Sequence, residues 1–366
     1  MRTSRRLLFG LLIASAAASA RSEGLPRKEY EVVRLADGVW AFLWKDPSAD
    51  LIESNALFVV NDRDVLVVDT GMVPSTARVM AAELKKLTDR PVRYVVNTHW
   101  HDDHHGGNEV YRELWPGVEF VAHRDTRADV LAQTYGTRPK DLDRLDAQAE
   151  KYARWAKTGV DDDGKTLEPS RRQRAEEIAA LSRALAPELR AIRETPPDLT
   201  FDDRLVLHRG GRTIEILWLG RGNTRGDVVV FLPEDRIAAT GDLFVQPIPF
   251  GFGSYYEEWA ATLGRLDALA ADVLVPGHGK VQRDRAYLRQ VEALLTALVA
   301  DVKAAVASGA TLEETRERVK LDDWKARFAG TDPSLQRAFD AFFVQPAVER
   351  AWHQARGDAD APVDRG

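Results

Sequence analysis

Residues 98–107 of the chain read THWHDDHHGG, and this stretch restricts both fold and chemistry more than any other. It holds four of the eight histidines of the chain: His99, His101, His104 and His105. Imidazole nitrogens and carboxylate oxygens are protein ligands of Zn²⁺ and similar ions. The spacing offers His99 and His101 as one pair of ligands, and Asp103 and His104 as another. Neither pair completes a coordination sphere, so the stretch predicts further ligands elsewhere, each at the end of a strand.

Two later residues are the best candidates for the missing ligands. His278 lies between two glycines directly after a predicted strand at residues 272–276 (DVLVP), and glycine lets the backbone approach a site closely. Asp242 follows the predicted strand at residues 236–240 (RIAAT) in the same manner. The other histidines lack a tight glycine turn and are interpreted as structural or solvated, although one of them also follows a predicted strand: His123, His208 and His353.

The remaining pattern alternates between strands and helices. Residues 30–45 alternate apolar and polar residues around an Asp-Gly pair, which is typical of a hairpin. Further strands are predicted at residues 55–60, 65–70, 92–98, 204–209, 212–219, 227–233, 236–240 and 272–276. Residues 75–88 predict a helix with Ser75 as its N-cap. Residues 125–191 read as inserted helices, and residues 283–366 as a helical extension. Two mixed halves of this kind predict packed sheets with helices outside, a layered α/β fold.

Residues 1–20 have the layout of a secretory signal peptide. Three arginines precede an uncharged run of 14 residues that starts at Leu7 and ends in Ala18-Ser19-Ala20, which predicts cleavage after Ala20. The run is shorter than the roughly 20 residues that span a bilayer, so a membrane anchor is the less favoured alternative. Ser4-Arg5-Arg6 resembles a twin-arginine signal. A periplasmic or secreted protein is expected, with no stable membrane insertion after signal removal.

The composition restricts the partners of the protein. A formal net charge of -6 leaves no basic excess to neutralise phosphates, so nucleic acid is not an expected partner. The chain has no cysteine, which excludes disulfides and restricts metal ligands to His, Asp, Glu, Asn and Gln. The composition does not define an oligomeric state.

The motifs resemble a known family when they are taken in order. HxHxDH at a strand end, the GG that follows it, GD after a later strand and PGHG after a last one resemble the metallo-β-lactamase fold hydrolases. The resemblance spans about residues 37–282 and includes Asp69-Thr70-Gly71. It implies a four-layer αβ/βα sandwich at residues 30–282, with the helical insertion at about 125–191, followed by the extension at 283–366. It also implies a site for one or two metal ions, usually zinc, with manganese or iron as alternatives.

The resemblance assigns roles to individual residues. The implied metal ligands are His99, His101, Asp103, His104, Asn223, Asp242 and His278. His99 and His101 would hold the first metal and Asp242 would bridge to the second. Asp103 would be both a ligand and a proton acceptor in catalysis, and Asp69 would orient ligands. His105 and Asp102 are expected to be spectators.

Asn223 departs from the family pattern, because the family usually has a third histidine for the first metal at this place. An amide oxygen is a neutral, harder donor than imidazole and suits Mg²⁺, Ca²⁺ or Mn²⁺ better than Zn²⁺. Three interpretations stay open. Asn223 is a working ligand of a retuned two-metal site, or the first site is partly empty and one ion does the work, or catalysis has been lost.

The expected function is an exported metal-dependent hydrolase that uses a metal-activated water on a small-molecule ester, lactone, lactam or amide. The alternative is a non-catalytic metal- or ligand-binding protein that retains the fold. Export disfavours glutathione thioesters, and Asn223 disfavours a mononuclear iron dioxygenase. The loop at residues 246–259 (QPIPFGFGSYYEEW) is rich in aromatic residues. These either line an apolar pocket or pack the core beneath the metal loops.

Overall fold

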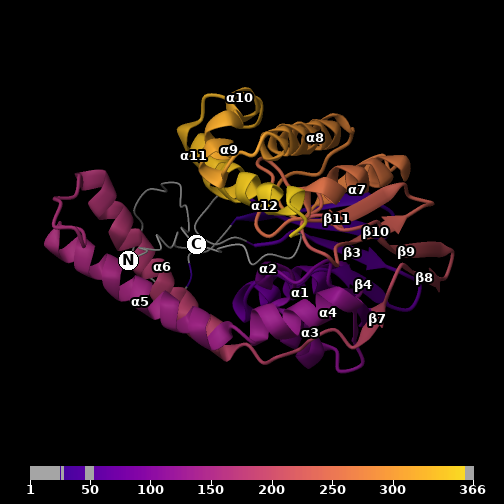
Figure 1. Cartoon of the computed structure of the whole chain (residues 1–366). Coiled ribbons are helices and arrows are strands. Elements are labelled where there is room, and N and C mark those ends of the chain that lie inside the picture. Colours follow the sequence, from indigo (N-terminus) through magenta and orange to yellow (C-terminus); the bar gives the residue numbers. More distant parts are fainter. Residues whose placement is uncertain (1–24, 26–28, 46–52, 359–366) are drawn as a thin grey trace.

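The computed structural model describes residues 25, 29–45 and 53–358. Two β-sheets pack against each other, and helices cover the outer face of each sheet, which confirms the expected αβ/βα sandwich (Figure 1). The predicted signal peptide, residues 1–20, lies outside the described residues. Among the helices of the described part, none has the length and apolar character that a bilayer span requires.

The first sheet has seven strands in the order β1 to β7. They are β1 (Tyr30–Ala36), β2 (Val39–Trp44), β3 (Ala56–Val60), β4 (Val65–Val68), β5 (Val92–Val96), β6 (Glu119–His123) and β7 (Leu199–Phe201). Neighbouring strands from β1 to β4 are antiparallel, and those from β4 to β7 are parallel. The sequence pattern does not predict β7, because three residues are too few to show the strand period of two.

The second sheet has five strands in the order β12-β11-β10-β9-β8. They are β8 (Arg204–Arg209), β9 (Arg212–Trp218), β10 (Val228–Leu232), β11 (Ile237–Gly241) and β12 (Val273–Pro276). All five agree with predicted strands. Only β11 and β12 pair in parallel, so their carboxyl ends share one edge of this sheet.

Alternate residues of each strand enter different cores, as the strand period of two requires. In β2, Val39, Ala41 and Leu43 pack between the sheets, whereas Phe42 and Trp44 face the helices outside the first sheet. Strands that are buried on both faces read as continuous apolar runs. This explains why the central strands were predictable from the sequence.

Helices α1 (Pro74–Leu87) and α3 (Asn108–Leu114) cover the first sheet. The expected N-cap at Ser75 is wrong, because α1 is capped at Val73 and starts at Pro74. Proline at the first helical position has the required φ and needs no hydrogen bond from its nitrogen, so it moves the helix start upstream of the serine.

Residues 124–191 are mainly helical, as the sequence predicts. They form α4 (Arg124–Asp129), the π-helix η1 (Val130–Tyr135), α5 (Arg138–Thr158) and α6 (Pro169–Ala191). Helices α5 and α6 lie side by side as a long pair that extends away from the sheets (Figure 1).

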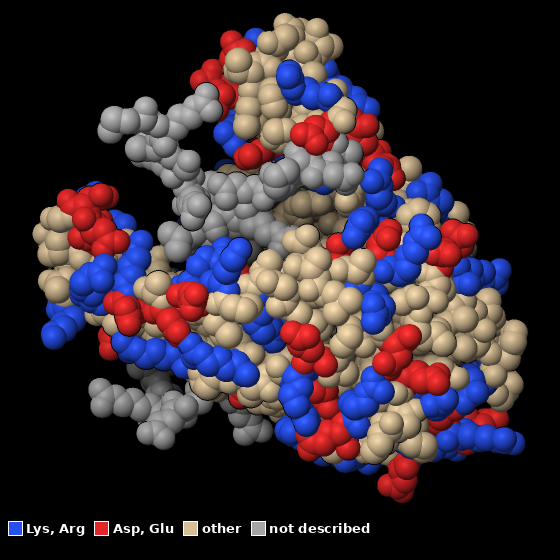
Figure 2. All heavy atoms as spheres, turned by 60° about the horizontal axis from the view of Figure 1, so that its bottom comes forward, with Lys and Arg blue, Asp and Glu red and all other residues tan. Residues whose placement is uncertain are grey.

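The helices on the second sheet, with the exception of the short helix at residues 312–318, share one hydrophobic core with the outer face of that sheet. They are α7 (Tyr256–Ala268), α8 (Ala286–Ala307), α9 (Leu312–Arg318), α10 (Asp322–Ala329), α11 (Pro333–Phe339), the π-helix η2 (Asp340–Val344) and α12 (Gln345–Ala355). The C-terminal helices therefore pack directly on the layer that carries β11 and β12. Figure 2 shows one face of the molecule, on which basic and acidic side chains are interspersed.

The side chain of Phe339 tests how strongly the C-terminal helices are joined to this core. It is fully buried, at 0% exposure. Phe339→Ala is expected to lower the free energy of unfolding by about 3–5 kcal/mol, because a large core side chain is lost and a cavity remains. Val79→Ala, at a side chain that is 36% exposed on α1, is the control and should change it by less than about 0.5 kcal/mol. Denaturant unfolding followed by circular dichroism measures both, and equal effects would contradict the shared core.

Candidate metal centre

The candidate ligands lie where strands of both sheets end. Asp69 follows β4, the HxHxDH stretch follows β5, Asp242 follows β11 and His278 follows β12. The side chains form two groups of three whose ligand atoms lie within 4.8 Å of one another: His99, His101 and Asp242, and Asp103, His104 and His278. The carboxyl ends of neighbouring parallel strands meet at one edge, so residues far apart in the chain converge there.

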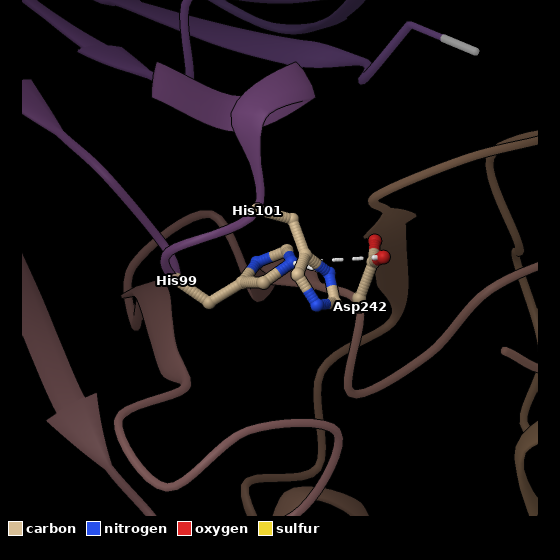
Figure 3. Close-up of side chains that lie close together, drawn as sticks. All are labelled: His99, His101 and Asp242. Atoms are coloured by element: carbon tan, nitrogen blue, oxygen red, sulfur yellow. Dashed lines mark hydrogen bonds and ion pairs between the residues drawn. The ribbon is translucent and has the colours of Figure 1, made fainter. Parts of the chain in front are cut away.

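In the first group, the two histidines and the aspartate point toward one another (Figure 3). Nε2 of His99 lies 2.9 Å from Nδ1 of His101. It also lies 3.7 Å from Oδ2 of Asp242. His99 and Asp242 are buried, while His101 is half-buried. Two imidazole nitrogens and one carboxylate oxygen thus face a common point.

The second group shares Asp242 with the first. Oδ1 of Asp242 lies 3.3 Å from Nε2 of His104 and 3.4 Å from Nε2 of His278. Oδ2 of Asp103 lies 3.4 Å from Nε2 of His104 and 3.1 Å from Nε2 of His278. Because its two oxygens face different groups, Asp242 is placed to bridge two ions.

Short α2 (Asp102–His105) explains the spacing within HxHxDH. His101 caps this helix in an extended conformation, and the next residues turn Asp103 and His104 toward the second group. The two glycines that follow allow close packing, because a Cβ atom at Gly106 or Gly107 would overlap backbone oxygens of residues 72 and 70. The glycines after HxHxDH therefore hold the turn against the loop after β4.

Asp69 sets the orientation of ligands in both groups. Its carboxylate accepts hydrogen bonds from the Thr98 backbone nitrogen and hydroxyl, both at 2.8 Å, and from Nδ1 of His104 at 2.8 Å. The Thr98 hydroxyl donates its only proton to Asp69, so it accepts a bond from Nδ1 of His99, 3.1 Å away. In the neutral rings, Nε2 of His99 and of His104 is therefore the nitrogen with the lone pair, and it can bind a metal.

Asp69 makes these contacts from an unusual backbone conformation. Its φ is +60°, a value that few non-glycine residues adopt and that Asn and Asp tolerate best. Such strain costs on the order of 1–3 kcal/mol and is commonly found at functional sites. Burial raises the pKa of the Asp69 carboxyl, while His104 and Thr98 favour its charged form.

His278 is oriented by the backbone. Its Nδ1 lies 3.0 Å from the carbonyl oxygen of Glu53, which can only accept, so Nδ1 carries a proton and Nε2 is the nitrogen that can bind a metal once it has lost its own proton. A Cβ atom at Gly277 would overlap Oδ1 of Asp242. The PGHG motif thus brings the backbone of His278 against Asp242, as the sequence predicts from its glycines.

The charges in the second group favour a cation. Burial by itself lowers the pKa of His104, but Asp103, Asp242 and Asp69 outweigh it and hold that pKa well above its usual range. Burial also lowers the pKa of His278, but Asp242 and Asp103 raise it to about 9. The same pairs hold the pKa values of Asp103 and Asp242 well below the usual range, against the effect of burial. A divalent ion can replace the protons that balance these carboxylates.

Metal affinity is therefore expected to rise with pH. Below pH 9 His278 carries a proton in the metal-free protein, as His104 does, and a divalent ion must displace both. Metal titrations by calorimetry at pH 7 in buffers of different ionisation enthalpy should show the release of one to two protons per ion. Binding without proton release would contradict this account.

Asp69→Asn is expected to weaken metal binding by about 10- to 100-fold, the usual cost of losing a hydrogen-bond partner of a metal ligand. Asparagine tolerates the same positive φ, so the variant changes the charge while it keeps the backbone. Competition with a chelator measures the affinity. Asp143→Asn, at an exposed position on α5, is the matched control and should bind as the original protein does.

Two buried atoms of the site have no hydrogen-bond partner among the described residues: Nε2 of His104 and Oδ1 of Asp242. They face each other at 3.3 Å. Buried polar atoms are nearly always satisfied, so a pair left open in this way fits a bound cation. The set of imidazoles and carboxylates suits zinc, manganese or iron.

Asn223 is the one predicted ligand that carries an amide in place of an imidazole or a carboxylate. It lies in the turn between β9 and β10, which is tied to the site by a 2.9 Å hydrogen bond from the Val228 nitrogen to the Thr98 oxygen. Its side chain is buried, and Oδ1 accepts a hydrogen bond of 3.2 Å from Ser254. Its Nδ2 has no partner among the described residues.

The other polar residues of interest lie outside the groups. Nε2 of His105 donates a hydrogen bond to the backbone oxygen of Trp100, 3.0 Å away, and burial lowers the pKa of His105 to about 3. Asp102 faces Arg138 on α5. His123 stacks on Trp218.

Three residues that were not among the predicted ligands also contribute to the site: Thr98, Glu53 and Ser254. Thr98 could have been found from its place directly before His99. Glu53 acts through its backbone oxygen, which leaves no side-chain signal.

Comparison with known proteins agrees with this architecture. The model of the metallo-beta-lactamase superfamily matches residues 49–278, more than half of the 366-residue chain. A linear primary-alkylsulfatase of Pseudomonas sp. is 23% identical over 289 residues, which cover 75% of this chain and 51% of that protein. A hydroxyacylglutathione hydrolase of Gloeobacter violaceus is 36% identical over 86 residues, 23% of this chain and 32% of that protein. The chain thus spans about half or less of each of these relatives.

Solved structures show the same fold at low identity. A metallo-beta-lactamase from Pontibacter korlensis superposes with a TM-score of 0.50 at 23% identity, covering 73% of this chain and 99% of that one. VMB-1 superposes with a TM-score of 0.51 at 17% identity, covering 74% and 99%. The match of the family model, together with the sandwich and the ordered HxHxDH, GD and PGHG motifs, shows that the chain belongs to the metallo-beta-lactamase superfamily.

Proposed function

We propose that the protein is an exported metal-dependent hydrolase that acts on a small ester, lactone, lactam or amide. The observation that carries this proposal is the convergence of six side chains in two groups that share the Asp242 carboxylate. Two adjacent groups of this kind are typical of hydrolases that hold two ions around one water molecule. The relatives in the superfamily include hydrolases, which supports the same reaction class.

The residues of the chain have distinct tasks in this proposal. Bound ions would act as Lewis acids and lower the pKa of a water molecule from about 16 toward 7. Asp103 lies at the second group with a part-exposed side chain, so it can accept a proton from the attacking water. Asp69 and Thr98 hold His99 and His104 in the tautomers that present Nε2. Asp242 links the two groups, because one of its carboxylate oxygens faces each group.

Sulfate esters are a second candidate substrate class. The alkylsulfatase is similar over 75% of this chain, whereas the hydroxyacylglutathione hydrolase is similar over 23%. Hydrolysis of a sulfate ester and of a carboxylic ester both need an activated water and stabilisation of a leaving alcohol. Export, which the first 20 residues predict, disfavours glutathione thioesters because they are cytoplasmic compounds.

Metal content and turnover together test the proposal. Purified protein is expected to bind about two equivalents of zinc, manganese or iron, and to hydrolyse at least one of p-nitrophenyl acetate, a simple lactone, nitrocefin or an alkyl sulfate. A chelator should abolish turnover, and restored metal should return it. Stoichiometric metal without turnover on all four classes would favour the non-catalytic alternative. Failure to bind any divalent ion would overturn the metal centre itself.

Export is tested separately. Expression of the full chain with periplasmic fractionation should yield a mature protein whose mass corresponds to a start at Arg21. Arg5 and Arg6 replaced together by lysine should leave the precursor in the cytoplasm if the twin-arginine route is used. An uncleaved, cytoplasmic chain would contradict export without affecting the metal centre.

A further inference from the structure

The aromatic residues of the loop before α7 fall into two kinds. Tyr255 and Tyr256 are buried and belong to the packing of α7. Phe250 and Phe252 are only half-buried. The two tyrosines therefore fit the interpretation of a core beneath the metal loops, whereas the two phenylalanines keep part of their apolar surface exposed to water.

A third aromatic ring comes from the C-terminal helices. The ring of Phe342, in η2, stacks on that of Phe250 with centroids 5.0 Å apart and an angle of 17°. It also meets the ring of Phe252 at 6.0 Å. Its neighbour Phe343 points into the core and is fully buried, while Phe342 is half-buried. Phe250, Phe252 and Phe342 form one cluster, called here the aromatic cluster.

The backbone holds the aromatic cluster in place. The nitrogen of Gly251 donates to the oxygen of Phe342 at 2.8 Å, which joins the loop to η2. Tyr256 donates its hydroxyl proton to the oxygen of Gly251. A Cβ atom at Gly251 would overlap that hydroxyl, so only glycine allows this approach. These hydrogen bonds therefore fix the backbones that carry Phe250 and Phe342 against each other.

The aromatic cluster lies beside the metal centre. The ring centroids of Phe250 and His278 are 6.0 Å apart. His278 presents Nε2 to Asp103 and Asp242, so the cluster adjoins the second group. If the reacting bond of a substrate lies at that group, the substrate atoms next to this bond would contact the aromatic rings.

We infer that the aromatic cluster binds an apolar group of the substrate, so the enzyme acts on esters that carry a medium-length alkyl or acyl chain, or an aryl group. This inference rests on the proposed hydrolase function. Part-exposed aromatic rings lose water favourably when an apolar group covers them. Because one of the three rings belongs to η2, the C-terminal helices contribute directly to substrate selection.

A chain-length series in the original protein and in Phe342→Ala tests this inference. Phe342 contacts the other rings but is not a candidate ligand, so its replacement leaves the metal groups intact. The original protein should hydrolyse p-nitrophenyl octanoate with a kcat/KM at least about 10-fold above that for p-nitrophenyl acetate, since each buried methylene is worth up to about fourfold. In Phe342→Ala, kcat/KM for the octanoate should fall about 10-fold and for the acetate less than about twofold. Ethyl and octyl sulfate replace these esters if only sulfate esters are hydrolysed.

Trp324→Ala is the matched control, because Trp324 is a half-buried aromatic of α10 in the same helical extension. It should leave the ratio of the two kcat/KM values unchanged. Metal content of each variant, measured after purification, shows whether the metal centre is intact. An unaltered chain-length ratio in Phe342→Ala, or equal losses on both esters, would show that Phe342 has a structural role only and would overturn the inference.

A binding measurement separates this inference from the proposed function. Decanoate is titrated calorimetrically into chelator-treated protein, and its affinity is expected to fall about 10-fold in Phe342→Ala. If no ester or sulfate is hydrolysed by metal-loaded protein, the proposed function fails while decanoate binding still decides the inference. Absence of decanoate binding in the original protein, or equal binding by both proteins, would overturn the aromatic cluster as an apolar binding surface.

Discussion

Asp242→Ala is expected to lower kcat/KM by at least about 1000-fold and to reduce bound metal from two equivalents to one or none. Among the described residues, this carboxylate is the side chain that both groups share, with Oδ2 toward His99 and Oδ1 toward His104 and His278. Loss of one ion removes several kcal/mol of charge stabilisation in the transition state, and about 4 kcal/mol corresponds to 1000-fold.

Asp242→Asn keeps the shape of the side chain and removes its charge. It therefore separates the effect of the charge on activity from the effect of side-chain packing. It should retain a folded protein with the same far-UV circular dichroism, but it should lose nearly as much activity, because an amide is a weaker bridging ligand. Asp143→Ala, at an exposed aspartate on α5, should have less than about a twofold effect. A fully active Asp242→Ala variant with two bound ions would remove Asp242 from the centre and contradict the bridging role.

The ligand pattern was predictable because its signals are local. The candidate ligands lie in the short segments that follow apolar strands, and the glycines after HxHxDH and on both sides of His278 mark places where the backbone packs closely. The layered fold was predictable for a related reason, since buried strands and amphipathic helices leave strong periodic signals. The start of α1 was not, because Pro74 overrides the capping preference of Ser75.

Other parts of the site depend on contacts between distant residues. Two successive hydrogen bonds join Asp69 to Thr98 and Thr98 to His99. They form only because β4 and β5 lie side by side in the fold, so the sequence alone does not predict them. Phe342 lies about 90 residues after Phe250 in the chain, and nothing in its local pattern distinguishes it from the buried Phe343. Tertiary packing, not local preference, decides which of the two joins the aromatic cluster.

Asn223→His is expected to raise the zinc affinity of the first group by at least about 100-fold. Imidazole is a stronger zinc ligand than an amide oxygen. Even the hydrogen-bond partners of ligands are worth about 10- to 100-fold in affinity, so a direct ligand should be worth at least as much. Chelator competition with zinc and with manganese measures the change, and the ratio of the two affinities should move toward zinc. Asn223→Ala is the companion variant, because it removes the amide without adding a ligand.

The contacts of Asn223 determine which amide atom can face the first metal. The Ser254 hydroxyl can donate to the amide oxygen or accept from the amide nitrogen, so a half-turn of the amide keeps this bond and moves the oxygen to the unpaired position of Nδ2. The backbone oxygen of Ser254 in turn accepts hydrogen bonds from Arg350 at 3.2 Å and Gln354 at 2.7 Å, both on α12. The C-terminal helices thus hold the residue that orients Asn223.

These contacts separate the three interpretations of Asn223. If the amide is a working ligand, Asn223→Ala loses the first ion and most of the activity, and Ser254→Ala weakens the same ion through the freed amide. If one ion does the work, Asn223→Ala leaves both metal content and turnover unchanged. If catalysis has been lost, Asn223→His gains a second zinc ion, and turnover of the ester panel either appears with it or stays absent because the substrate site has changed as well. Ser254→Ala removes the hydroxyl that contacts Asn223 and keeps the backbone oxygen that Arg350 and Gln354 of α12 hold, so a loss of the first ion in that variant would act through Asn223.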